Sequence, residues 1–517
     1  MSGSLNLQNN FAGMGVRLAQ ERIEGEAYLM GTQTPSARLA ESIFTKTSHI
    51  HGLTKTVKPL LNLASVLLEE SLDNATAMTD AYSGATTTSK SIQSLPSWQR
   101  TILLECLFLL HRQEEGHISP TLPGTSPHAE TARRLAAILR LTQWIVERNL
   151  LESEKVLIQE NEREVWLFVR EIPEEELRSP ATERATSLWN RVVSTPVRIL
   201  SASADADLPK TFLNPSHTLD EALHRIIHRQ LRHFLSRIYG LSIGEDLEYV
   251  HEMRVATRRI RAAMKIFKKA MNSKLILLQK EIKDWASDLG RVRDLDVLQE
   301  FLSDYMAREG RMDPFILRLS DKLQKKRIQG IETLLKHFTG EKISSMEQKY
   351  AFYLESSGPA LPATDPIVLG KVAPAYIGRR LQKTIQQTSN LNHLDSKKLH
   401  TLRIQCKGCR YAAEFLEELY SKGLKPLIRT MTLMQDHLGK VHDADVYREK
   451  LLMHMKKSSP KRRDPKAEKE LLEYLSKWRK RSLKQARVTW QRFLEPANVK
   501  EIREILAHTM TTSHQNG

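Results

Sequence analysis

Basic side chains recur at helical spacing in "HEMRVATRRIRAAMK", residues 251–265, a stretch that holds one histidine and five basic residues. At about 100° per residue, five of these positions fall within an arc of roughly 80° on one face of a helix. These five positions, here named the first ladder, are His251, Arg254, Arg258, Arg261 and Lys265. Arg259 points away from them. Because the ladder rises about 5 Å per turn, it suits an extended anion with repeating charges better than one compact phosphate.

The same pattern returns 149 residues later, in "HTLRIQCKGCR". This second ladder consists of His400, Arg403, Lys407 and Arg410, and Glu414 stands where a fifth cation would follow. A further motif keeps the offset, since "LGRVRDLDV" at 289–297 matches "LGKVHDADV" at 438–446. Two motifs that recur at one offset indicate an internal duplication.

A single basic row is typical of a solvated helix face. Like charges three or four residues apart on a helix, however, destabilise that helix by about 0.2–0.5 kcal/mol per pair. A chain that repeats this cost at the same spacing is expected to bind a compensating anion. The duplication therefore favours a polyanion-binding site over a merely solvated surface.

The positive charge of the chain is concentrated after residue 200. Over 517 residues, Lys and Arg outnumber Asp and Glu by 78 to 61, a formal net charge of +17. Residues 1–200 hold 20 basic and 23 acidic side chains, whereas the remainder holds 58 and 38. A polyanionic partner is therefore expected for the C-terminal part alone. With three cysteines and no stretch near the roughly 18 apolar residues of a membrane helix, we expect a cytoplasmic protein with no membrane partner.

Apolar residues at three-to-four spacing predict helices along most of the chain. The exception is "EKVLIQENEREVWLFVR", residues 154–170, whose two β-prone runs around a charged turn predict a hairpin. A helix near 181–194 and a strand in "PVRIL" would complete a small α+β unit. The predicted domains are a helical domain, the α+β unit, a polar linker and the duplicated basic region, at residues 12–153, 154–200, 201–217 and 218–507. The duplicated region would have halves of about 218–355 and 367–507, separated by "SSGPALPATDP".

The ladders and the motifs that follow them resemble the two halves of the conserved-histidine α-helical (CHAD) domain, over about residues 215–505. The resemblance implies a mainly α fold with two four-helix bundles related by a pseudo-twofold axis. It also implies a cationic groove that binds inorganic polyphosphate. By position, it assigns the family's histidine and basic groups to His251, Arg254, Arg258, Arg261, Lys265, His400, Arg403, Lys407 and Arg410. On the following helices it adds Lys280, Arg291, Arg429 and Lys440.

The N-terminal region resembles, over roughly 12–200, the C-terminal part of exopolyphosphatase/guanosine pentaphosphate phosphatase proteins. This resemblance implies an HD-like helical domain followed by an α+β unit. The HD ligands are missing, because Glu69-Glu70 replace His-Asp and the next histidine cluster reads "MTDAYSGATTTSK". A metal-dependent phosphohydrolase needs several such ligands at one site. We therefore expect a non-catalytic module that docks a protein partner or extends the binding surface.

Two pairs of aspartates are candidates for magnesium ligands that bridge phosphate oxygens. They are Asp294 and Asp296, with their repeat partners Asp443 and Asp445. Because residues two positions apart on a helix do not share a face, the pattern favours salt bridges that orient the ladder arginines, or helix capping.

Two other functions would use the same charge. A nucleic-acid-binding protein is one, and the basic segment "KWRKRSLKQARVTWQRF" at 477–493 supports it. The aromatic residues near the ladders occupy core positions, however, whereas base stacking needs exposed rings. The other is a metal-dependent phosphohydrolase acting on polyphosphate or phosphorylated nucleotides.

The sequence thus predicts a non-enzymatic protein that binds inorganic polyphosphate through its ladders. It predicts no catalytic residue, no metal site and no cofactor. Nucleic acid is the less favoured partner, and association with polyphosphate granules would follow from binding.

Overall fold

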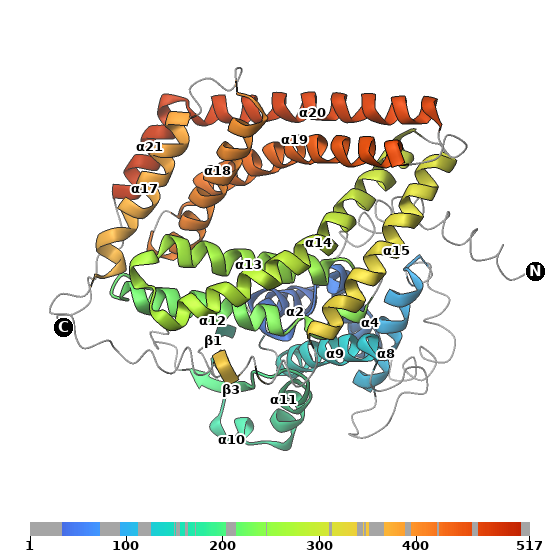
Figure 1. Cartoon of the computed structure of the whole chain (residues 1–517). Helices are drawn as coiled ribbons and strands as arrows, with labels where there is room; N and C mark the ends of the chain where they lie inside the picture. The colour runs from blue at the N-terminus through green and yellow to red at the C-terminus, as the bar shows by residue number, and fades with distance from the viewer. Residues whose placement is uncertain are drawn as a thin grey trace, which may run out of the picture.

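The computed structural model describes most of the chain after residue 33. The described residues are 34–72, 92, 94–111, 126–148, 150, 156–160, 164–170, 172–202, 213–243, 246–309, 313–338, 345, 348–350, 367–387, 394–420, 423–457 and 464–507. Among them helices dominate and strands are confined to one small sheet (Figure 1). This confirms the predicted mainly α class with a small α+β unit. The predicted domain start at residue 12, most of the linker and the boundary at 356–366 lie outside these residues.

The N-terminal helices are α2 (Pro35–Lys46), α3 (Ser48–His51), η1 (Lys55–Val57), α4 (Lys58–Leu72), α8 (Ser97–His111) and α9 (Pro127–Val146). The helices α2 and α9 begin alike. The side chains of Thr34 and Ser126 accept hydrogen bonds from backbone amides of the first turn, and a proline follows each of them. Proline is favoured there because the first helical N–H has no intrahelical partner. Within the described part of the chain, no helix is both long and apolar enough to cross a bilayer.

The sheet has the order β1–β2–β3. The strands β1 (Val156–Glu160) and β2 (Val165–Arg170) pair antiparallel, which confirms the predicted hairpin. The strand β3 (Val197–Ala202) lies parallel to β2, and the connection contains α10 (Glu174–Leu177) and α11 (Pro180–Val192). Val165, Leu167 and Val169 of β2 point into a hydrophobic core that also includes residues of α9 and α11. The α+β unit and the helices before it therefore share one core.

Two helical halves make up the C-terminal region. The first contains α12 (Leu219–Leu235), η3 (Ile238–Ser242), α13 (Glu248–Ile266), η4 (Lys268–Ala270), α14 (Ser273–Glu309) and α15 (Pro314–His337). The second contains α17 (Leu369–Gln387), α18 (Ser396–Leu416), η6 (Glu417–Leu419), α19 (Lys425–Lys457), α20 (Pro465–Phe493) and α21 (Pro496–Ala507). The ladders therefore lie on α13 and α18, and the second repeated motif lies on α14 and α19.

The starts of the two halves pair with each other. The amide of Leu219 donates to Ile367 O at 3.2 Å, and the amide of Leu369 donates to His217 O at 2.9 Å. Leu219 and Leu369 stand 150 residues apart, one more than the offset of 149 that relates the two ladders. These two bonds form the antiparallel bridge between Thr218 and Val368, which ties the starts of the two halves together. The pseudo-twofold relation of the two bundles stays a prediction.

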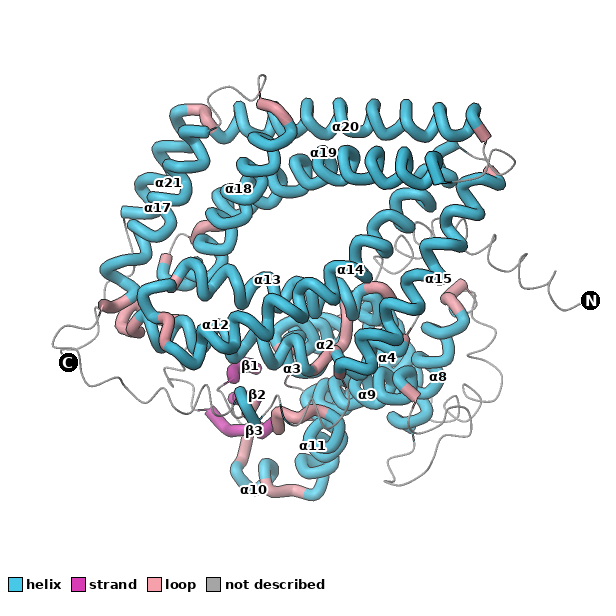
Figure 2. The backbone as a smooth tube through the Cα atoms, in the orientation of Figure 1, coloured by secondary structure: helices cyan, strands magenta, loops and turns pink. Residues whose placement is uncertain are grey.

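Two hydrophobic clusters join the halves. One includes Met253 of α13 and Leu402 of α18. The other joins the later parts of α14 and α19 to the first turns of α15 and α20, and in it the rings of Phe301 and Tyr447 lie 5.3 Å apart. Between the two clusters, α13, α14, α18 and α19 surround an opening in the backbone trace (Figure 2). Both ladder helices border this opening.

Candidate anion-binding site

The two ladder helices pack against each other, so both ladders lie at the junction of the halves. Arg261 and Lys265 are exposed near the end of α13. The other members of both ladders are partly buried, and none is fully buried. Neighbouring atoms therefore cover part of most ladder side chains without enclosing any of them.

One arginine of each ladder lies over a glycine of the next helix. A Cβ placed on Gly290 of α14 would stand 3.7 Å from Arg254 Nη1, and one on Gly439 of α19 would stand 3.7 Å from Arg403 Nε. The two glycines, like the two arginines, are 149 residues apart. The repeated "LG" motifs thus present a flat helix surface to the guanidinium group of Arg254 in one half and of Arg403 in the other.

Lys407 lies where the two ladders converge. Burial, together with the positive charges of four arginines, lowers the pKa of the Lys407 ammonium to about 7. In order of decreasing effect, the four are Arg258, Arg403, Arg254 and Arg261. Three of them come from α13 and one from α18, so cations of both halves act on one side chain. The site has a concentrated positive potential that an anion would neutralise.

Two carboxylates at equivalent positions accompany the arginines that lie over the glycines. Asp294 Oδ1 lies 4.0 Å from Arg254 Nη2. Its repeat partner Asp443 has a pKa raised by burial, and Arg403 is the strongest charge acting against that rise. Asp294 therefore orients a ladder arginine, as predicted for the aspartates.

The other aspartate of each pair contacts a different helix. Asp296 is fully buried and accepts a hydrogen bond from Arg327 Nε of α15 at 2.6 Å. Asp445 accepts one from Arg479 Nε of α20 at 2.7 Å. Both aspartates form salt bridges, but the prediction that they orient ladder arginines is wrong for these two. The reason is that residues two positions apart on a helix face different neighbours. No cluster of three or more potential metal ligands occurs among the described residues.

Residues 225–452, from α12 to near the end of α19, match the family model of the CHAD domain. The chain contains a CHAD domain. The chain is similar to the crystal structure of the CHAD domain from the plant Ricinus communis, with 23% sequence identity and a TM-score of 0.41. The match covers 59% of this chain and 98% of that chain. The chain is 19% identical to PptA from Streptomyces chartreusis, with a TM-score of 0.39, over 53% of this chain and 99% of that chain. No curated protein matches the chain. Since the family match begins at residue 225, the HD-like resemblance of the N-terminal region stays a prediction.

The far end of the second ladder is an ion-pair cluster between the two halves of the CHAD domain. Glu414 of α18 pairs with Arg259 of α13, and its carboxylate also lies 3.3 Å from Arg410 Nε. The Arg259 guanidinium stands 5.0 Å from the ring centre of Phe415. Arg410 is therefore already partnered within the protein. The sequence did not reveal the role of Arg259, because a helical wheel shows the face of one helix and not its neighbour.

The histidine of the first ladder is neutral at pH 7. Burial lowers the pKa of His251 to about 4, and the charge of Arg293 acts in the same direction. In the second half, the rings of His400 and His442 lie 4.7 Å apart. Because neutral imidazole has one N–H donor, His251 is suited to a hydrogen bond with an anion rather than to charge neutralisation.

The cations assigned to α14 and α19 lie at the borders of the site. All four are exposed: Lys280 and Arg291 on α14, and Arg429 and Lys440 on α19. Each lies about 80–100° around the helix axis from the glycine of its own helix, which is Gly290 on α14 and Gly439 on α19. Lys283 is also exposed and lies only about 20° from Gly290, nearer to the direction of Arg254. Comparison of the repeats missed Lys283 because Thr432 stands at the equivalent position.

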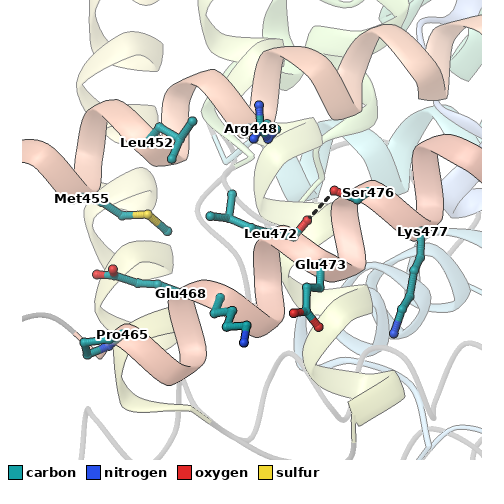
Figure 3. A pocket seen from close by; sticks show the side chains of 10 residues that line it. Arg448, Leu452, Met455, Pro465, Glu468, Leu472, Glu473, Ser476 and Lys477 are labelled. Atoms are coloured by element: carbon teal, nitrogen blue, oxygen red, sulfur yellow. Dashed lines mark hydrogen bonds between the residues drawn. The ribbon is translucent and has the colours of Figure 1, made fainter.

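A hollow of about 570 Å³ lies elsewhere in the structure, between α19 and α20 (Figure 3). Leu452, Met455 and Leu472 line it together with charged side chains at its edge, and Ser476 Oγ donates to Leu472 O beside it. None of its lining residues belongs to a ladder. An extended polyanion requires a broad binding surface rather than an enclosed pocket.

Affinity for an anion is expected to rise as the pH falls from 8 to 6. Lys407, whose folded-state pKa is near 7, is mostly neutral at pH 8, and a bound anion stabilises its charged form. Binding at pH 8 should therefore take up about one proton per protein, measurable by calorimetry in buffers with different ionisation enthalpies. Lys407→Arg, which is charged at both pH values, should bind without that uptake. A wild-type affinity that does not change with pH would contradict this role of Lys407.

Proposed function

We propose that this protein binds inorganic polyphosphate through the two ladders of its CHAD domain and that it catalyses no reaction. The observation that carries the proposal is the convergence of Lys407 with four arginines from both halves. Cations whose charges act on one side chain repel each other until an anion neutralises them. The proposed contacts are the residues of the two ladders, with Lys280, Lys283, Arg291, Arg429 and Lys440 at the borders.

The chemistry of polyphosphate fits this arrangement. The polymer carries negative charge at every unit of a flexible chain, and the ladders present a cation on successive helical turns, about 5 Å apart. Arginine offers a planar fork of donors that matches two phosphate oxygens at once. Arg254 and Arg403, supported by the glycines beneath them, are the side chains that we expect to engage phosphate in this way.

The aromatic residues favour a bare phosphate chain over single-stranded nucleic acid. Base stacking on exposed rings supplies much of the affinity for single strands. The rings of Phe267, Tyr411 and Phe415 beside the ladders are buried. Trp490 of the basic segment at 477–493 is buried as well. These rings cannot stack on a base without unfolding the helices that hold them.

The inferred role is binding rather than catalysis. Charge neutralisation along a polymer requires no bond to form or break, and arginine, which keeps its proton throughout the physiological pH range, suits that task better than proton transfer. The match to a CHAD domain also supports a binding role.

We place the polyphosphate-binding domain at residues 218–507, since α12 begins at Leu219 and α21 ends at Ala507. A cytoplasmic protein of this kind would associate with polyphosphate granules. Microscopy of a fluorescent fusion in cells with and without polyphosphate tests this, because loss of the foci on depletion is the expected result.

Competition between polymers tests the proposed function. Long-chain polyphosphate should displace bound single-stranded RNA at a phosphate concentration at least about tenfold lower than the reverse exchange needs. Affinity should fall steeply with salt, since each neutralised phosphate adds about 0.7–0.9 to the slope of log K against log salt in nucleic acids. If RNA displaces polyphosphate more readily, the nucleic-acid alternative is favoured. Orthophosphate released after magnesium is added would favour the phosphohydrolase.

A further inference from the structure

The ladder helix α13 is attached to the N-terminal region through a buried arginine. Arg237, which follows α12, has only 1% of its surface exposed. Its Nη2 donates to the backbone oxygens of Ser48 at 2.7 Å and Leu53 at 3.1 Å. Its Nε bonds to the carboxylate of Glu252 on α13. One cation thus joins the N-terminal region, the end of α12 and the ladder helix.

Glu252 lies on the side of α13 that faces away from the first ladder. At about 100° per residue it stands roughly 140° from the centre of the ladder face. The contact with Arg237 therefore holds α13 from behind and leaves the ladder side chains accessible.

A second buried contact holds the start of α13. The side chain of Asp246 accepts hydrogen bonds from the hydroxyls of Thr54 and Thr56 at 2.7 Å each. Its other oxygen accepts the amide of Glu248, in the first turn of α13, at 3.0 Å. Lys55 Nζ lies 3.3 Å from the carboxylate of Glu248 as well. The segment from residue 52 to 57 is therefore bound directly to the N-terminus of the ladder helix.

The surfaces in contact are closely complementary. Gly52 has φ +72°, and a Cβ at this position would stand 2.0 Å from Ser236 O, so the backbone approaches the end of α12 in a way that no other residue permits. From α9, Arg134 donates to His51 O at 2.8 Å, and its guanidinium lies 4.2 Å from the ring centre of Tyr239. Such fit is typical of a fixed interior contact rather than a loose junction between domains.

We propose that the N-terminal region is a brace for the ladder helix, and that Arg237, Glu252 and Asp246 are positioning residues for polyphosphate binding. The inference rests on the proposed function. Its physical reason is the repulsion between the ladders: the arginines of α13 and the cations of α18 push the two helices apart, so anchoring at the back of α13 keeps them converged. Burial raises the pKa of both carboxylates, which shows that their charges depend on the partners named here.

A pair of isosteric substitutions tests the brace in the full-length protein. Thr54→Val/Thr56→Val removes both hydroxyls that bond Asp246 and keeps the shape of the side chains. Thr54→Ser/Thr56→Ser keeps both hydroxyls and is the matched control. Binding of long-chain polyphosphate is measured at several salt concentrations for both variants and the wild type.

We expect the valine variant to bind about tenfold more weakly at 0.15 M salt, with unchanged stoichiometry and a smaller salt slope, because fewer ladder cations reach the polymer. The serine variant should match the wild type. A variant that is only less stable would show a lower stoichiometry with the same affinity and slope. That result, or an affinity equal to the wild type, would overturn the brace.

Amide hydrogen exchange tests the brace independently of polyphosphate binding, so it shows which of the two proposals is wrong if one of them fails. Without any ligand, the valine variant should exchange amides of α13 faster than the wild type, while those of α18 keep their rates. Unchanged exchange in α13 would overturn the brace even if polyphosphate binds. Faster exchange in α13 in a protein that binds no polyphosphate would leave the brace standing as a structural device and overturn its role in that binding.

Discussion

Reversal of four ladder charges is expected to lower the affinity for long-chain polyphosphate by at least about a hundredfold. The substitutions are Arg254, Arg258, Arg403 and Lys407→Glu, which replace the converging cations of both halves. A hundredfold loss corresponds to about 2.7 kcal/mol, or less than 1 kcal/mol for each reversed charge. This is a conservative expectation, since two charges 4 Å apart near a protein surface interact by about 4 kcal/mol. Fluorescence anisotropy with a labelled polymer at 0.15 M salt measures it.

A matched variant separates the site from the net charge of the chain. Lys322, Lys326, Lys480 and Lys484→Glu changes the net charge by the same amount, on exposed positions of α15 and α20 that carry no ladder. This control should lose no more than about threefold in affinity, because salt screens the attraction between exposed charges and a polymer that they do not contact. Equal losses in the two variants would mean that the protein attracts polyanions only through its overall charge.

Breaking the buried ion pair of the first half is expected to cost about 3 kcal/mol of unfolding free energy. In Arg327→Met, the fully buried Asp296 loses the cation that donates to it at 2.6 Å. Removal of one partner from a buried pair usually costs about 3–5 kcal/mol. The lower end applies here, because Arg293 remains 3.8 Å from the same carboxylate. Denaturant unfolding monitored by circular dichroism measures the change.

Two further variants identify the cause. Adding Asp296→Leu to Arg327→Met removes the unpaired charge and should recover most of the lost stability. The equivalent pair of the second half, Asp445 and Arg479, has side chains 34% and 32% exposed, so Arg479→Met should cost only about 1 kcal/mol. Lys325→Met, which breaks the exposed pair with Asp321, should change stability by less than about 0.5 kcal/mol. If the double variant is no more stable than Arg327→Met, lost packing rather than an unpaired charge is the cause.

Much of the architecture could be predicted from local pattern. The hairpin of β1 and β2 followed from two β-prone runs around a charged turn, and the mainly α class followed from apolar periodicity. The helix α12 begins where the linker composition ends, because Thr218 and Glu221 form a capping box. These features depend on residues close together in the chain, so the sequence states them directly.

The sequence by itself also determined the two ladders and their duplication, because spacing along one helix decides which side chains share a face. Only the tertiary structure decided what those faces meet. Arg259, which points away from the first ladder, pairs with Glu414 of the other half, and Lys407 lies among arginines of both helices. Asp246 meets Thr54 across 192 residues of chain. Contacts of this kind depend on how distant helices pack, and helical periodicity carries no information about that.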